Sequence, residues 1–175
     1  PSKDRDSAPK FEHRADLPEL TIDSAKIKVF AGNFLEFDSI MTIFSDLVGL
    51  EAQIEAKSSS ILPLRADFEH GLLMVAGSAL VNGQPVAENE LFYLEVGSAE
   101  LKIETDGPVT AILVGGVPFE EKIVMWWNFV AGSQKEITEA REQWNARDLR
   151  FGDFEDQIGG WIPAPELPHV TLQPR

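Results

Sequence analysis

Residues 62–83, "LPLRADFEHGLLMVAGSALVNG", are the stretch that decides the fold. Their centre, "GLLMVAG", is a continuous apolar run of strand length, and it predicts a strand buried on both faces. The next residues, "SALVNGQPV", contain Asn82-Gly83, a pair that tolerates positive φ at both turn positions and therefore predicts a tight hairpin. Consecutive strands joined by a short turn favour an antiparallel β-domain.

Short apolar runs separated by turn residues continue on both sides of this stretch. "LEAQIEA", residues 50–56, alternates apolar and polar residues with the period of a half-buried strand. The other predicted strands are "IKVFAG" (27–32), "IMTIF" (40–44), "LFYLEVG" (91–97), "AELKIET" (99–105) and "VTAILVGG" (109–116), with Asp106-Gly107-Pro108 as a further turn. Many short strands without intervening helices indicate a sandwich or barrel.

The pattern changes after residue 116. Ser133 and Glu136 have the spacing of a capping box and predict one short helix from about residue 134 to 146. Ile137 and Trp144 recur at helical spacing, so we expect both to pack on the body of the protein.

Two further segments are apolar or rich in proline. Residues 123–130 are too apolar for a free loop, and we expect them to close one side of the barrel or to meet a partner. The end of the chain, "IPAPELPHVTLQPR", holds four prolines and predicts an extended tail over a surface, with Trp161 and Ile162 as anchors.

Composition excludes several classes of function. The 175 residues include 29 acidic and 15 basic residues, giving a formal net charge of -14, and no Lys/Arg cluster that would track nucleic-acid phosphates. No apolar run approaches the length of a bilayer span, and no signal-peptide pattern opens the sequence. Because cysteine is absent, disulfides and thiolate metal sites are excluded. The sequence predicts a soluble, cytoplasmic protein that binds neither nucleic acid nor membrane.

Longer motifs resemble a known family. Residues 62–83, followed by "ILVGGVPFEEKIVMWWNFVAGSQKEITEAREQW" (112–144), resemble the C-terminal half of a pirin, a two-barrel member of the cupin superfamily. The features that carry this resemblance are the turn "GGVP" (115–118), the segment Phe129-Val130 and the helix start Glu136-Ile137. "VMWWNFV" resembles the actinobacterial branch, and the likeness extends from about Phe11 to Arg175.

The resemblance implies a mainly β fold: a single cupin barrel of the jelly-roll type, one short C-terminal α-helix and an extended proline-rich tail. It also implies three regions. Residues 1–12 would be an interdomain linker remnant, residues 13–150 the cupin domain and residues 151–175 a tail packed on that domain. The iron site of pirins, three histidines and a glutamate, belongs to the first barrel, so iron is expected in an N-terminal domain that is absent here.

The metal-ligand pattern of cupins can be laid on this chain. Gly77 takes the closing glycine of the first cupin motif, which puts His70 where the glutamate ligand would be, and Gly97 takes the glycine of the second, which puts Glu100 at a histidine position. The two remaining histidine positions fall on Leu64 and Ala66, or on Pro63 and Arg65. Imidazole ligands at fixed spacing are therefore missing, and we expect neither metal nor cofactor in this chain.

A pocket of the barrel remains a candidate site. The pocket candidates are Arg65, Glu69, His70 and Glu100, and no catalytic residue is assigned. For His70 the favoured interpretation is a barrel histidine bonded to a backbone carbonyl or a carboxylate. The alternative is a small-molecule or enzymatic pocket that uses His70 with nearby carboxylates.

Adjacent tryptophans mark a candidate interface. Trp126, Trp127 and Phe129 could border the N-terminal cupin domain. The favoured interpretation is structural, with one tryptophan pointing into the barrel end and the other outward under the tail. The resemblance implies a structural partner of the iron-binding barrel in an intact protein with quercetin 2,3-dioxygenase activity or a role in transcriptional co-regulation. Self-association through exposed apolar surface, or binding of another protein through the tryptophans, stays open.

Overall fold

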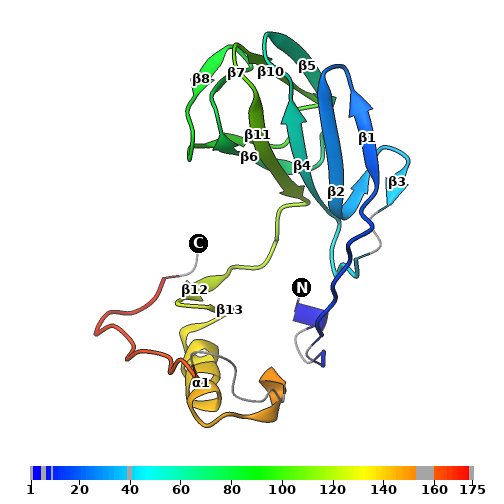
Figure 1. The fold of residues 1–175 in the computed structure, drawn as a ribbon. Helices are drawn as coiled ribbons and strands as arrows, with labels where there is room; N and C mark the ends of the chain where they lie inside the picture. Colours follow the sequence, from blue (N-terminus) through cyan, green and yellow to red (C-terminus); the bar gives the residue numbers. More distant parts are fainter. Residues whose placement is uncertain (1, 5–6, 9, 39–40, 153–159, 174–175) are drawn as a thin grey trace. The chain divides into compact units, whose positions relative to one another are not determined.

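The computed structural model describes residues 2–4, 7–8, 10–38, 41–152 and 160–173. The chain forms two compact units (Figure 1). We call Glu12–Pro118 the barrel unit, and Phe119–Arg175 together with Pro1–Phe11 the helical unit. The region boundaries expected at residues 12 and 150 stay a prediction.

The larger sheet of the barrel unit is antiparallel. Among the described residues its order is β1-β2-β4-β11-β6-β9, and β3 pairs with β2. The strands are β1 (Glu19–Ile22), β2 (Ala25–Phe34), β3 (Phe37–Asp38), β4 (Leu47–Ile54), β6 (Glu69–Ala76), β9 (Leu91–Leu94) and β11 (Val109–Gly116). Strand β11 therefore lies between β4 and β6.

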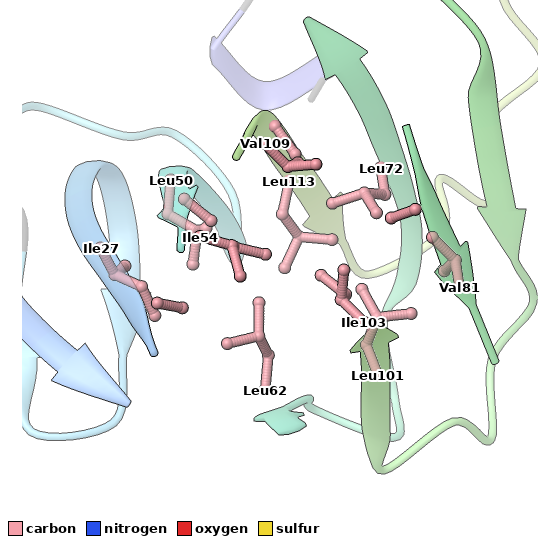
Figure 2. Close-up of a cluster of buried hydrophobic side chains, with 14 of the residues drawn as sticks. Ile27, Leu50, Ile54, Leu62, Leu72, Val81, Leu101, Ile103, Val109 and Leu113 are labelled. Carbon is pink, nitrogen blue, oxygen red and sulfur yellow. The ribbon is translucent and has the colours of Figure 1, made fainter. Parts of the chain in front are cut away.

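The smaller sheet has the order β5-β10-β7-β8. Its strands are β5 (Ser58–Pro63), β7 (Ala79–Val81), β8 (Gln84–Val86) and β10 (Glu100–Thr105). Figure 2 shows side chains of this sheet, such as Leu62 and Ile103, pointing toward side chains of the larger sheet, such as Leu50 and Leu113. These four side chains are fully buried, so the two sheets share one apolar core. The predicted mainly β fold is confirmed.

Local turn chemistry behaves as predicted at the β7–β8 hairpin. Asn82 and Gly83 both have positive φ, 48° and 77°, and join β7 to β8. The side-chain oxygen of Asn82 also accepts a hydrogen bond from the backbone N–H of Lys102 at 2.9 Å. This contact ties the hairpin to the neighbouring strand β10.

Two strand predictions were wrong. Residues 41–44 of the predicted strand 40–44 form no strand, and residue 40 lies outside the described residues. Strand β6 is buried on one face only: Leu72 and Met74 lie in the core, while Leu73 and Val75 are exposed. The apolar run does not alternate in sequence because the outer face of the sheet is apolar at these positions as well.

The helical unit consists of a hairpin, a helix and extended chain. Strands β12 (Val124–Trp126) and β13 (Phe129–Ala131) pair, and α1 (Gln134–Asn145) follows, with short 3-10 turns at Ser2–Asp4 and Leu149–Phe151. The predicted N-cap is confirmed, since Ser133 Oγ accepts from the N–H of Glu136. The Glu136 side chain reaches back as expected, and its Oε2 accepts from the N–H of Gly132, one residue before the cap. Among the described helices, none combines the length and the apolar character needed to cross a bilayer.

Aromatic side chains form the core of the helical unit. The rings of Trp127 and Trp144 meet edge to face at 5.8 Å, and Phe129, which is buried, lies 5.3 Å from Trp127. Trp161 stacks on Trp144 at 4.2 Å, and Trp144 Nε1 donates to the carbonyl of Ile162 at 2.8 Å. Ile162 therefore anchors the tail to α1 through its backbone carbonyl, because its side chain is exposed.

The hairpin turn between β12 and β13 determines how the two adjacent tryptophans are oriented. Trp127 has a φ of 51°, which a bulky side chain rarely adopts, and this turn directs its ring onto Trp144. Trp126 is half-buried and stacks near Phe129. Residues 124–131 therefore form an element of the helical unit's own core.

Candidate functional site

A cavity of about 330 Å³ opens at one end of the barrel unit. The residues that line it come from β2 and the turn after it, β4, β5 and the loop after it, β6 and β11. They are Asn33, Phe34, Leu35, Val48, Pro63, Leu64, Arg65, Phe68, His70 and Leu113. Most of these side chains are apolar, and the polar groups are an amide, a guanidinium and an imidazole.

His70 lies at the inner wall of this cavity. It is the second residue of β6, and its side chain is only 2% exposed because it points to the core side of the sheet. Its Nδ1 has no hydrogen-bond partner among the described residues, so the bond favoured from the sequence is not made by this atom. Burial lowers the pKa of His70, and the charge of Asp67 opposes this shift. The imidazole is therefore neutral at neutral pH.

Gly115 makes room for the His70 ring. The two residues are direct partners in the antiparallel pair of β11 and β6. A Cβ on Gly115 would lie 2.5 Å from Cδ2 of His70 and 2.8 Å from the carbonyl oxygen of Glu69. Because no larger residue fits this gap, the glycine at this position sets the place of the histidine.

Arg65 lies at the cavity in a network that balances its charge. Its Nε and Nη2 donate to the two carboxylate oxygens of Asp67, at 3.1 and 2.5 Å, and Asp46 lies 3.7 Å away. The guanidinium also lies over the ring of Phe68, 4.0 Å from its centroid. The bond from Arg65 lowers the pKa of Asp67. The pair is exposed, so it contributes little to stability but orients the guanidinium.

The other two pocket candidates lie outside the cavity lining. Glu69 precedes His70 in β6, and its Oε2 accepts a hydrogen bond from the hydroxyl of Tyr93 at 2.7 Å. Glu100 begins β10 and is exposed. The structure therefore brings Arg65 and His70 to one cavity without Glu69 or Glu100, and the assignment of these residues to a function stays a prediction.

Sequence reasoning missed the wall that β2 contributes. Asn33, Phe34 and Leu35 lie 35 or more positions before His70 in the sequence and reach the cavity through sheet pairing. Leu35 has a φ of 54°, an unusual conformation for leucine that no local signal in the sequence announces.

The lining residues do not fit an iron ion. A non-haem iron site typically takes two histidines and a carboxylate on one face of the metal. Here the lining supplies His70 with no carboxylate, beside the positive charge of Arg65. No group of three or more histidine, aspartate or glutamate side chains within the described part of the chain could hold a metal ion.

Facing antiparallel sheets with a shared core and a cavity at one end agree with a cupin fold. Residues 49–152 match the Pirin C-terminal cupin domain. The chain belongs to the pirin family.

Relatives and solved structures agree with this assignment. A Pseudomonas aeruginosa protein provisionally named a quercetin 2,3-dioxygenase is 36% identical over 96% of this chain and 53% of its own length, and a pirin-like protein of Caulobacter vibrioides is 25% identical over 95% and 57%. A crystal structure of a quercetin 2,3-dioxygenase from Acinetobacter baumannii is 36% identical with a TM-score of 0.89, covering 99% of this chain and 58% of that one. The chain spans about half the length of the relatives it matches.

We predict that Gly115→Ala destabilises the barrel unit and displaces His70. The new methyl group would overlap the imidazole and the Glu69 carbonyl, and overpacking of this kind costs about 1–3 kcal/mol. Urea unfolding, monitored by far-UV circular dichroism, measures the loss in the free energy of unfolding. Gly107→Ala is the matched control, since a Cβ there meets no atom within 4 Å. Equal stability of the two variants would contradict the close approach.

His70→Leu should remove a pH dependence of stability. Because the folded-state pKa of His70 is lowered, the unfolded chain binds more protons as pH falls below the ordinary value of about 6.5, and wild-type stability declines there. Leucine also removes a buried unsatisfied nitrogen, which costs about 1–3 kcal/mol. The free energy of unfolding is measured for both proteins at pH 7.5 and 5.5. The stability of the variant relative to wild type should be greater at pH 5.5. His13→Gln serves as control, and an unchanged difference at both pH values would refute the prediction.

Proposed function

We propose that this chain is a cupin domain without metal that serves as the structural partner of an iron-binding cupin domain in a longer pirin protein. The observation that carries the proposal is the composition of the cavity wall, where one buried histidine stands with apolar residues and a charge-balanced arginine. The cupin scaffold is kept, and the ligand set that iron requires is not assembled around it.

The reaction we propose for the intact protein is of the quercetin 2,3-dioxygenase class. The support is the name carried by relatives that match this chain over about half their length. Iron bound in the partner domain would supply the oxygen chemistry. This chain would contribute packing surface, and its lack of cysteine fits the reducing cytoplasm, where we place the protein.

The outer face of the larger sheet is the surface we propose for the partner domain. Leu91 and Leu73 are cross-strand partners on this face, and Tyr93 and Val114 both lie opposite Gly71. All four side chains are exposed, and with Val75 they form an apolar patch typical of an interface. We call these five residues the β6–β9 face. The tryptophans considered from the sequence pack within the helical unit, and their assignment to an interface stays a prediction.

An enzymatic pocket in this barrel is less well supported. Acid–base chemistry that pairs His70 with a carboxylate needs that carboxylate within hydrogen-bond reach of the imidazole. Glu69 contacts Tyr93, and Asp67 contacts Arg65, so neither shares a hydrogen bond with His70. His70 lacks a second residue of that kind in the cavity lining.

We predict that the purified chain holds far less than one iron per molecule, whereas the full-length protein holds about one. Mass spectrometry of metals in both preparations measures this, and His70→Gln in the full-length protein should leave its iron content unchanged. The reason is that one imidazole beside a guanidinium cannot replace a three-ligand set. Stoichiometric iron in this chain that His70→Gln removes would contradict the proposal.

We further predict that Leu91→Lys weakens association between this chain and the separately expressed remainder of the protein. A charge on the β6–β9 face at Leu91, which is 62% exposed, would be buried without a partner in the complex. Titration calorimetry measures the dissociation constant. Ile61→Lys is the matched control, because Ile61 is 44% exposed on the smaller sheet. Equal affinities of the two variants would remove this face as the interface.

A further inference from the structure

We propose that the outer edge of β9 binds an extended protein segment with apolar side chains at its centre and lysine or arginine at its ends. The segment would add one strand to the larger sheet of the barrel unit. The edge lies in the plane of this sheet, whereas the β6–β9 face is its outer surface. The proposal therefore goes beyond the proposed function and does not depend on it.

Strand β9 is the last strand of the larger sheet within the described ranges, where it pairs with β6 alone. The carbonyl of Glu90 accepts from the N–H of Met74 at 3.0 Å, so these two residues begin a series of hydrogen-bonded pairs. Such pairs alternate along antiparallel strands, and Phe92 therefore directs its N–H and C=O groups to β6. Leu91 and Tyr93 direct theirs away from β6, to the outer edge of the sheet.

This edge is open to strand addition. In the part of the chain that the structure describes, no group bonds to the backbone N–H of Leu91 or of Tyr93. Proteins commonly protect edge strands with lysine or proline, and the four residues of β9, "LFYL", contain neither. An extended segment can therefore form backbone hydrogen bonds at both positions, as in other cases of strand addition.

Side chains on both faces of β9 select an apolar centre for the segment. Leu91 and Tyr93 are exposed on the outer face of the sheet, and Phe92 is only half-buried where it packs against the core on the other face. Directly opposite residues of paired strands have Cβ atoms about 4.5–5.5 Å apart. Alternate side chains of an added strand would thus contact these three residues, and apolar ones gain most from doing so.

Acidic residues at both ends of β9 select basic ends for the segment. Glu88 and Glu90 precede the strand, Glu95 follows it, and all three are exposed. The sequence holds no lysine or arginine between Arg65 and Lys102. Basic residues at the ends of an added strand would face these glutamates, whereas a second copy of β9 would bring like charges together. Charge complementarity therefore favours a basic segment over self-pairing.

Two synthetic peptides, KKVTVTVKK and EEVTVTVEE, test the proposal on the purified chain. Both have the alternation of a strand and differ only in the charge of their ends. Titration followed by backbone amide NMR measures the dissociation constants. We expect the basic peptide to bind about ten-fold more tightly at low salt, because its ends face glutamates, and the difference should shrink at high salt.

Amide hydrogen exchange locates the added strand. In the chain alone, the N–H of Phe92 should exchange slowly and those of Leu91 and Tyr93 quickly, and the basic peptide should slow the latter two. Leu91→Pro removes an outward N–H at an edge position, where proline is tolerated. It should bind the peptide about five-fold more weakly than Leu91→Ala, the matched control that also lacks the leucine side chain but keeps the N–H. Far-UV circular dichroism checks that both variants fold.

Modified peptides make the test independent of protein variants. Methylation of alternate backbone nitrogens blocks one edge of a peptide strand, so one methylation pattern of KKVTVTVKK should abolish binding and the complementary pattern should retain it. The proposal is overturned if neither unmodified peptide binds, if the acidic peptide binds as tightly as the basic one, or if both methylation patterns behave alike. It is also overturned if the amides of Leu91 and Tyr93 become protected as the concentration of the chain alone rises, since this edge would then bind a second copy.

Discussion

Strand β11 is the element on which the barrel unit depends, because it pairs with β4 on one side and with β6 on the other. It pairs with β4 from Val109 through Gly116, and with β6 from Thr110 through Gly116. Leu113, at its middle, is fully buried and contributes both to the core and to the cavity wall. Two positions further along, Gly115 leaves the space that the His70 ring fills. Sheet continuity and the site are thus set by the same eight residues.

The sequence predicted those parts of the fold that follow from local chemistry. The alternation around Leu50, Ala52 and Ile54 is visible because only one face of β4 is buried, and all three lie in the core. The turn at Asn82-Gly83 and the cap at Ser133 depend on neighbouring residues alone. Strand β5 begins with three serines and was missed, because it is defined by its pairing with β10 in the smaller sheet, which leaves Ser60 fully buried.

The site could be predicted only in part, and the strand period explains why. Adjacent residues in a strand point to opposite faces, so Glu69 and His70 cannot both enter one cavity once β6 begins at Glu69. The same rule separates Glu100 from its buried neighbour Leu101 in β10. Placing the strand start at residue 71 hid this constraint. The contribution of Asn33, Phe34 and Leu35 depends on sheet order, which the pattern of apolar residues does not specify.

A buried imidazole nitrogen without a partner among the described residues lowers the stability of the barrel unit. Leaving such a group unsatisfied costs about 1–3 kcal/mol, a sizeable part of the 5–15 kcal/mol by which a domain is usually stable. Gly115 holds the ring in place on one side, so His70 cannot relieve the cost by moving toward β11. The close packing that places the imidazole therefore also keeps its Nδ1 unsatisfied.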